Sequence, residues 1–494
     1  MVVTLLAGEA QHGLIKGCIS PTGGPCKDQS VDQTKTECRC PTSFPSLVGI
    51  GASFNQSLFH AMGEVIADES RAYFNAVNGS TNLMYWAPSI NLARNPMWGR
   101  NQEVPGEDPL VNGLYGQVFI ERLQGGVKAI DWDNVTAEPL KSGASIKHFI
   151  AYDVECSSGG DTSQGAGATQ TPFDCDAPGV DRFHFEGFLS DADLTDYYLA
   201  IFQRAIGKAR PASIMCSFPS INGVPSCANG LMQNTLARDT WGFEGFVVSD
   251  CGGVDFLNQG HYLADTPQGA VAAALKGGLD AECGIPGPWG HGNYLATHMN
   301  ETVSQRLLNQ SELDRSAMRV WRTAFRLGLF EPLSSSPWSH LGYEDIGSEV
   351  SQQTALDAAV QSMVLLKNKG DLLPIDLGKH KTIAVIGPFQ NATVEMQGGY
   401  SGPSMIIHSH SPGAVLVERV SVANKGTTLL WSAGVDNGKN NTDQVAAAVV
   451  VAKQADVALL FIGDTHVSEF RDRTDNGLEF SQNALLQVNT NNYL

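Results

Sequence analysis

Short apolar runs alternate with longer amphipathic segments over the first two thirds of the chain. Apolar runs of strand length occupy four segments, at residues 83–92, 145–150, 212–217 and 245–249. Between them, residues 56–77 and 194–209 repeat apolar side chains with the period of an α-helix. Alternation of strands and helices predicts a parallel sheet covered by helices. In a region of this length, the pattern favours a barrel over an open sheet.

A Pro- and Ser-rich segment, residues 330–342, separates this region from a second alternating pattern. A helical pattern follows at residues 351–368, and strands are expected at residues 382–387 and 456–463. The chain stops without an obvious last strand, so we expect the second domain to be incomplete. The predicted boundaries are residues 1–332 for a barrel domain, 333–352 for a linker and 353–494 for a second α/β domain.

Composition limits the class of protein and of partner. Of the 494 residues, 42% are hydrophobic and 17% are charged, which is typical of a soluble globular protein rather than a disordered one. The formal net charge of -19 disfavours nucleic acid as a partner, because phosphates would be repelled. No apolar run reaches the roughly 18 residues that span a bilayer, so no membrane partner is expected.

Cysteines and glycosylation sequons indicate the compartment. The sequons begin at Asn55, Asn78, Asn134, Asn300, Asn309, Asn391 and Asn440. With ten cysteines, they favour an extracellular, disulfide-bonded glycoprotein. The start of the chain resembles no signal peptide, so we expect that peptide to be absent from this sequence. The Gly-, Ser- and Thr-rich residues 156–180 predict a surface loop tied at its base by Cys156 and Cys175.

No metal or cofactor motif stands out. Four cysteines, Cys18, Cys26, Cys38 and Cys40, lie close together but lack a CxxC spacing. His408 and His410 have no acidic or third histidine neighbour in the sequence. A phosphate-binding glycine loop and a serine-hydrolase elbow are both absent, so neither a metal nor a cofactor is predicted.

Asp250 directly follows the apolar run at residues 245–249 and precedes two glycines. It fits two interpretations equally well: a helix N-cap, or a reactive carboxylate at the carboxyl-terminal rim of a barrel. Lys147 and His148 lie inside another expected strand, where a lysine is costly to bury without acceptors. These two residues favour the second interpretation.

Further polar residues gather near other strand ends. Residues 91–109 contain Trp98 together with Arg94, Arg100, Glu103, Glu107 and Asp108, and Glu9 and His12 lie near the start of the chain. Arginines beside a tryptophan could form a purely structural cation–π cluster. The alternative is a site for a polyhydroxyl ligand, because sugar hydroxyls need both donors and acceptors and the apolar face of a sugar packs on an aromatic ring.

At these residues the chain resembles glycoside hydrolase family 3, and within it the β-xylosidase branch. The similar segments include "ARNPMWGRNQEVPGEDP", "KHFIAYD", "MCSFPSINGVPSCAN", "RDTWGFEGFVVSDC" and "VIGPFQNATVEMQGGYSGP", in the order of the family. The resemblance implies an α/β fold, with a TIM-like (β/α) barrel followed by an α/β sandwich and the sugar bound between them. It also implies that the start of the barrel and a third, fibronectin-like domain are missing.

The resemblance implies retaining glycoside hydrolysis by two carboxylates. Asp250 matches the family's nucleophile. Glu469, the glutamate in "GDTHVSEFRDRTD" close to Asp472 and Arg473, matches the acidic loop that supplies the general acid/base. An acid has to be protonated at working pH, so closure of the cleft should raise the pKa of Glu469 relative to that of Asp250.

The family's sugar-binding motifs imply further roles. Substrate-binding candidates are Glu9, Arg100, Lys147, His148, Arg182, Glu155, Cys251 and Phe218. Cys251 indicates the xylosidase branch, since glucosidases of the family usually carry tryptophan after the nucleophile. The resemblance suggests disulfides Cys216–Cys227 and Cys251–Cys283. Phe218 replaces a tyrosine of the family, so a hydroxyl that would contact the nucleophile is missing.

The predicted activity is release of β-D-xylose from the non-reducing ends of xylooligosaccharides. Two alternatives lie in the same family: a β-glucosidase and an α-L-arabinofuranosidase. An inactive carbohydrate-binding homologue is a third alternative, which the replacement at Phe218 motivates.

Overall fold

The computed structural model describes residues 7–26, 37–126, 139–155, 181–284, 293–402, 410–436 and 442–464, and the shorter pieces 468–469, 471–473, 477–478 and 481–493. Four features named above lie outside these residues: the loop between Cys156 and Cys175, His408, and the sequon asparagines Asn134 and Asn440. No helix in the described ranges is long and apolar enough to cross a membrane.

The first domain is built on a parallel sheet whose strand order follows the chain. Its strands are β1 (Ala7–Gly8), β2 (Met84–Tyr85), β3 (Gly143–Phe149), β5 (Ser213–Cys216) and β8 (Phe246–Ser249). A parallel bridge from Val248 to Ala281 continues the sheet beyond β8. Parallel strands in chain order, with helices between them, form the TIM-like barrel that the sequence predicts.

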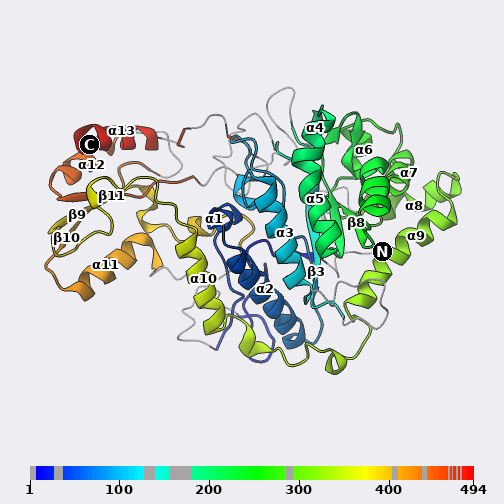
Figure 1. Cartoon of the computed structure of the whole chain (residues 1–494), viewed down its shortest axis with the longest axis horizontal. Helices are drawn as coiled ribbons and strands as arrows, with labels where there is room; N and C mark the ends of the chain where they lie inside the picture. Colours follow the sequence, from blue (N-terminus) through cyan, green and yellow to red (C-terminus); the bar gives the residue numbers. More distant parts are fainter. Residues whose placement is uncertain are drawn as a thin grey trace.

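Helices cover the outer face of this sheet (Figure 1). They are α1 (Leu47–Ala52), α2 (Gln56–Ala76), α3 (Pro109–Leu123), α4 (Asp191–Asp193), α5 (Ala200–Arg204), α6 (Asp255–Gln259), α7 (Pro267–Gly277), α8 (Tyr294–Ser304) and α9 (Gln310–Arg326). Side-chain oxygens start several of them: Asn55 accepts from two N–H groups at the start of α2, and Asp108 precedes Pro109 of α3. Segments with π-helical hydrogen bonding are Leu194–Leu199, Ala205–Ala209 and Leu231–Thr240.

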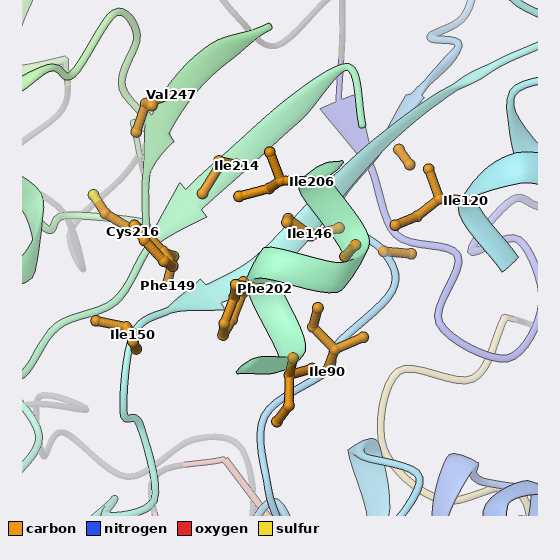
Figure 2. Close-up of a cluster of buried hydrophobic side chains, with 14 of the residues drawn as sticks. Ile90, Ile120, Ile146, Phe149, Ile150, Phe202, Ile206, Ile214, Cys216 and Val247 are labelled. Atoms are coloured by element: carbon orange, nitrogen blue, oxygen red, sulfur yellow. The ribbon is translucent and has the colours of Figure 1, made fainter. Parts of the chain in front are cut away.

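The core lies between the strands and these helices (Figure 2). Phe202 and Ile206 extend from the segment around α5 over β3 and β5. The rings of Phe149 and Phe202 pack edge-on there, with their centroids 5.0 Å apart. Burial of each such side chain stabilises the folded state by about 1.5–3 kcal/mol relative to its exposure to water. This packing fixes the strand ends on which the polar residues sit.

The strand expected at residues 83–92 is shorter than predicted. Only Met84–Tyr85 pairs as β2, and the chain returns to β3 as a single bridge from Ser89 to Lys147. Pro88 has no N–H to donate to a neighbouring strand, so it interrupts the ladder. Ile90 resumes it by donating to the Lys147 carbonyl at 2.9 Å.

The segment predicted as a linker packs against the barrel. Asn75 of α2 donates to the carbonyls of Trp338 and Leu341, and the Glu69 carboxylate accepts from Gly347 N. α10 (Glu349–Gln361) then begins the second part of the chain. It ends seven residues earlier than the predicted 351–368, with Ser362 as its C-cap, and the apolar side chains of residues 363–366 beyond it are exposed.

The second domain has a three-stranded parallel sheet of order β10-β9-β11. Its strands are β9 (Thr382–Ile386), β10 (Thr428–Ser432) and β11 (Val457–Leu460), and its helices are α11 (Pro412–Ala423), α12 (Val445–Lys453) and α13 (Gln482–Tyr493). These elements lie together at one end of the molecule, away from α7–α9 of the barrel (Figure 1). Central β9 is the most buried strand of this sheet, with Ile383, Val385 and Ile386 fully buried.

Described cysteines form disulfides Cys18–Cys40, Cys26–Cys38, Cys216–Cys227 and Cys251–Cys283. The last two confirm the pairs that the family resemblance suggests. Both involve residues at the ends of β5 and β8, so they tie the loops beside Asp250.

Candidate active site

The carboxyl ends of three barrel strands carry the predicted site residues. Glu9 follows β1, Lys147 and His148 lie near the end of β3, and Asp250 follows β8. Because the strands are parallel, these ends share one rim of the sheet. The described residues contain no group of three His, Cys, Asp or Glu side chains that could hold a metal ion.

Asp250 is buried and held from one side only. Its Oδ1 accepts from Cys251 N at 2.7 Å, while its Oδ2 has no hydrogen-bond partner among the described residues. α6 starts five residues later, after Val254, and no side chain caps it. Asp250 is therefore not a helix cap, and its free oxygen lies 3.7 Å from His148 Nε2.

His148 is a neutral hydrogen-bonding group. Its backbone N donates to Asn91 Oδ1 at 2.7 Å, and its ring Nδ1 lies 3.0 Å from the same oxygen. Burial and the neighbouring cations, Arg100 among them, lower its pKa well below the ordinary value. With the proton on Nδ1 directed at Asn91, Nε2 presents a lone pair that can accept from a ligand hydroxyl.

Glu9 and Lys147 form a buried pair of opposite charge. Lys147 Nζ donates to Glu9 Oε1 at 2.7 Å, while Glu9 Oε2 has no hydrogen-bond partner among the described residues. Burial raises the pKa of Glu9 to about 7, against the opposing effect of Lys147. The pair places a donor and a free acceptor side by side, which suits adjacent hydroxyls of a sugar.

Two buried arginines complete the rim. Arg100 donates through Nε and one terminal nitrogen to both oxygens of Glu103, at 2.9 and 2.8 Å. Arg182 donates to Glu155 Oε2 at 2.9 Å and to the Tyr152 hydroxyl at 2.8 Å. Bidentate and shared contacts of this kind fix the planes of both guanidinium groups.

A loop of the second domain reaches this rim. Glu469 Oε1 lies 2.9 Å from Arg182 and 3.6 Å from Arg100. Its Oε2 accepts from the Tyr400 hydroxyl. Tyr400 also belongs to the second domain, and its ring lies 4.7 Å from Lys147 Nζ. Glu469 thus lies beside groups from both domains.

The pKa values of Glu469 and Asp250 are shifted in directions opposite to those expected. Although burial opposes ionisation, Arg100 and Arg182 lower the pKa of Glu469 well below its ordinary value. Burial raises the pKa of Asp250 to about 6 instead. The prediction that cleft closure raises the pKa of Glu469 relative to that of Asp250 is therefore wrong, because the sequence did not reveal that both guanidinium groups meet this carboxylate.

Asp472 fastens the same loop to the barrel. Its Oδ1 accepts from Gly99 N at 2.8 Å, and its Oδ2 accepts from Glu155 N at 2.9 Å. Arg473 N donates to the Met97 carbonyl at 2.7 Å. Gly99 permits this approach, because a Cβ there would lie 2.0 Å from the Arg471 carbonyl oxygen.

Several polar and aromatic residues singled out in the sequence make structural contacts. Arg94 donates to the Tyr198 hydroxyl and Asp108 caps α3, so neither joins the site. Trp98 donates to Glu155 Oε1 at 2.9 Å rather than stacking on Arg100, whose guanidinium lies instead 5.5 Å from the rings of Tyr152 and Tyr400. His12 bridges the domains, with Nε2 2.8 Å from the Gly399 carbonyl oxygen.

Phe218 and Cys251 lie beside the charged groups, but neither side chain carries a charge. The Phe218 ring packs 4.7 Å from the Arg182 guanidinium and edge-on to Phe183. Tyr152, which lies between His148 and Phe218, supplies a hydroxyl in this part of the site. Cys251 contributes its backbone N–H to Asp250, and its side chain is bonded to Cys283.

Three residues of the site were not predicted. Asn91 orients His148, Tyr152 links Glu155 to Arg182, and Tyr400 covers Lys147 from the second domain. Tyr152 follows the Lys-His pair by a few residues, so its spacing could have suggested it. Tyr400 lies far away in the sequence, and no local pattern marks it.

Comparisons with known proteins agree with this architecture. The Glycosyl hydrolase family 3 N terminal domain matches residues 29–176 and 185–323, and the family's C-terminal domain matches residues 363–493. The chain belongs to glycoside hydrolase family 3.

Similar proteins within the family include plant and fungal proteins that are named as xylosidases. Beta-D-xylosidase 1 of Arabidopsis thaliana is 35% identical over 437 residues, which cover 88% of this chain and 50% of that protein. Probable exo-1,4-beta-xylosidase bxlB of Aspergillus terreus is 34% identical over 452 residues, covering 90% and 52%. The chain thus spans about half the length of these relatives.

Solved structures share the fold. A family 3 exo-beta-xylosidase (XlnD), in complex with a xylobiose aziridine activity-based probe, superposes with a TM-score of 0.79 at 28% identity, covering 98% of this chain and 56% of that one. A beta-glucosidase from Listeria innocua in complex with glucose gives a TM-score of 0.71 at 24% identity, covering 90% and 54%.

Gly99 offers a test of the domain contact. In Gly99→Ala, the new methyl group would displace the loop that carries Glu469 and Asp472, and we expect hydrogen exchange in residues 468–473 to rise about tenfold or more. Gly207→Ala is the matched control, because a Cβ there meets nothing within 4 Å. Unchanged exchange in Gly99→Ala, measured by mass spectrometry, would contradict the described contact.

Proposed function

We propose that this chain is the catalytic part of a retaining exo-acting β-D-xylosidase that releases xylose from the non-reducing ends of xylooligosaccharides. The observation that carries the proposal is the state of Asp250: buried at the barrel rim, anchored through Oδ1, with Oδ2 free. The identities with plant and fungal xylosidases support the choice of sugar. The proposed units are a barrel at 1–332, a linker at 333–352 and a sandwich at 353–494.

In this proposal each part of the rim has a role. Asp250 Oδ2 attacks the anomeric carbon, the bond to the leaving oxygen breaks, and that oxygen takes up a proton from a general acid. Water then attacks the same carbon and gives up a proton to the conjugate base of that acid, which cleaves the glycosyl ester and restores both the Asp250 carboxylate and the acid. Cys251 N holds the second carboxylate oxygen throughout, so the nucleophile keeps its orientation.

The remaining side chains hold the sugar. Glu9 Oε2 and His148 Nε2 accept from ring hydroxyls, and Lys147 and Arg182 donate to them. Each of these groups is oriented by another residue, as Asn91 orients His148, so the site is arranged before the sugar enters. The disulfides and sequons support an extracellular location for the protein.

A substrate panel tests the choice of sugar. We expect kcat/KM for 4-nitrophenyl β-D-xyloside to exceed that for the β-D-glucoside and for the α-L-arabinofuranoside by about 10-fold or more, since one misfitting group costs roughly that much. A faster reaction with the glucoside would favour the glucosidase alternative, for which solved β-glucosidases of the same fold give a precedent. No reaction with any of the three would favour an inactive homologue.

Replacement of the nucleophile tests Asp250 itself. Asp250→Ala should lower kcat on the xyloside by on the order of 10⁴-fold, because the covalent step is lost. Added azide should then yield xylosyl azide of inverted configuration. The control is Asp314→Ala on the exposed face of α9, which should keep wild-type rates. A turnover of Asp250→Ala close to wild type would remove the assigned nucleophile.

The raised pKa of Asp250 predicts the pH profile. The nucleophile reacts as the carboxylate, and burial raises its pKa to about 6, so kcat/KM should fall about tenfold per pH unit below pH ~6. Glu9→Gln should lower the rate but retain this limb, since Asp250 still has to ionise. An acid limb near pH 4, where an ordinary aspartate titrates, would contradict the effect of burial.

A further inference from the structure

One of the glycosylation sequons, which begins at Asn391, lies beside a pocket of the second domain. Asn391 ends the short 3₁₀ helix Pro388–Asn391, which follows β9, and its side chain is exposed. Asn55 of another sequon differs, because its amide nitrogen, the atom that would carry a glycan, donates to Gln361 Oε1 at 2.7 Å. The Asn391 side chain is thus accessible for modification in the folded protein.

The pocket beside Asn391 has a volume of about 580 Å³. The residues that line it come from the 3₁₀ helix and the segment after it, the start of α11 and β10, and they include Gln390, Asn391, Thr393, Ser411 and Trp431. α11 and β10 lie at the end of the molecule away from α7–α9 (Figure 1). Among the described residues, the pocket shares no lining side chain with the candidate active site.

Trp431 forms an aromatic wall of the pocket and is 40% exposed. Its indole lies close to the start of α11, because a Cβ at Gly413 would come within 2.8 Å of a ring carbon of Trp431. Glycine at this position therefore lets the ring lie against the helix while part of its surface faces solvent. A half-exposed indole presents an apolar face on which the C–H groups of a pyranose ring can pack.

Gln390 and Ser411 form the polar part of the pocket. Gln390 is 8% exposed, and its Oε1 has no hydrogen-bond partner among the described residues. A buried oxygen in this state favours a ligand that donates to it. Ser411 Oγ accepts from Ala414 N at 3.2 Å, and its own O–H can still donate. An aromatic face, an acceptor and a donor suit the ring, the amide N–H and the amide carbonyl of an N-acetylamino sugar.

We propose that Asn391 carries an N-linked glycan whose first N-acetylglucosamine lies in this pocket against Trp431. The donor is a lipid-linked oligosaccharide diphosphate. Asn391 Nδ2 loses a proton and bonds to the anomeric carbon, and the bond from that carbon to the phosphate oxygen breaks, so that the lipid diphosphate leaves with the electron pair.

The attachment point itself favours this ligand over a free sugar. Because Asn391 lines the pocket, a glycan on its Nδ2 is held there at an effective concentration of roughly millimolar or more. Glycosylation requires the secretory route, which the disulfides support, and it is independent of glycosidase activity.

Enzymatic trimming tests where the glycan lies. The protein is secreted from yeast, which adds mannose-rich glycans, and is treated in the native state with endoglycosidase H, which cleaves between the first two N-acetylglucosamine residues. Mass spectrometry of the glycopeptides gives the rate at Asn391. In Trp431→Ala we expect trimming about 10-fold faster than in wild type, because the inner sugar no longer packs on a ring. Val422→Ala, at an exposed position of α11, is the matched control and should keep the wild-type rate.

Two results of this experiment would overturn the proposal. The first is secreted wild-type protein in which Asn391 is unmodified. The second is a trimming rate at Asn391 that is the same in wild type and in Trp431→Ala.

Hydroxyl-radical footprinting separates an attached glycan from a free oligosaccharide. Oxidation of Trp431 should be about 5-fold faster in Asn391→Gln than in the glycosylated wild type, because the indole is then uncovered. Millimolar xylotriose should leave the rate in Asn391→Gln unchanged. Protection of Trp431 by xylotriose to the wild-type level would assign the pocket to a free sugar and contradict the proposal.

Discussion

Charge compensation in a dry environment is the constraint on which the site depends. Arg100 and Arg182 are almost completely buried, and an isolated charge in such surroundings would cost several kcal/mol. Each arginine is neutralised by a barrel glutamate and then shares a third carboxylate from the other domain. The barrel rim and the second domain are therefore coupled electrostatically, and the shape of the proposed sugar site depends on their contact.

The same constraint explains why Asp250 differs from the other carboxylates. Glu103, Glu155 and Glu469 all meet a guanidinium group, whereas Asp250 Oδ2 lies free beside a neutral histidine. An unpaired buried oxygen is costly in the free protein, and this cost favours binding of a group that can interact with it. Such a cost falls on the atom proposed to react, and also on Glu9 Oε2, which is proposed to bind a sugar hydroxyl.

Much of the fold could be predicted from the sequence. Short apolar runs predicted β3, β5, β8 and β9 closely, because a strand that is buried on both faces is apolar at consecutive positions. Pro88 shortened β2, a local effect that the period alone does not show, and α10 ended before the apolar residues 363–366. Strand ends also predicted Lys147, His148 and Asp250.

Contacts between distant segments could not be predicted. Tyr400 and Asp472 reach the rim from the second domain, and their partners depend on how the domains pack. The pKa of Glu469 depends on the same packing, so the order expected from a role as general acid did not anticipate the two arginines. Gly99 carried no sequence signal either, since only the approach of the Ser468 and Arg471 carbonyls shows why a side chain is excluded there.

The bond between Cys251 and Cys283 has a practical consequence for anyone producing this protein. The residue that donates its N–H to the reactive carboxylate is covalently joined to the next part of the rim, and Cys216 beside it is bonded to Cys227. Synthesis in a reducing bacterial cytosol would leave all four sulfurs as thiols and loosen the peptide that aims the carboxylate. In protein from such a host, the Asp250 carboxylate would be poorly oriented. Secretion to the bacterial periplasm or from yeast supplies the oxidising conditions in which both disulfides form.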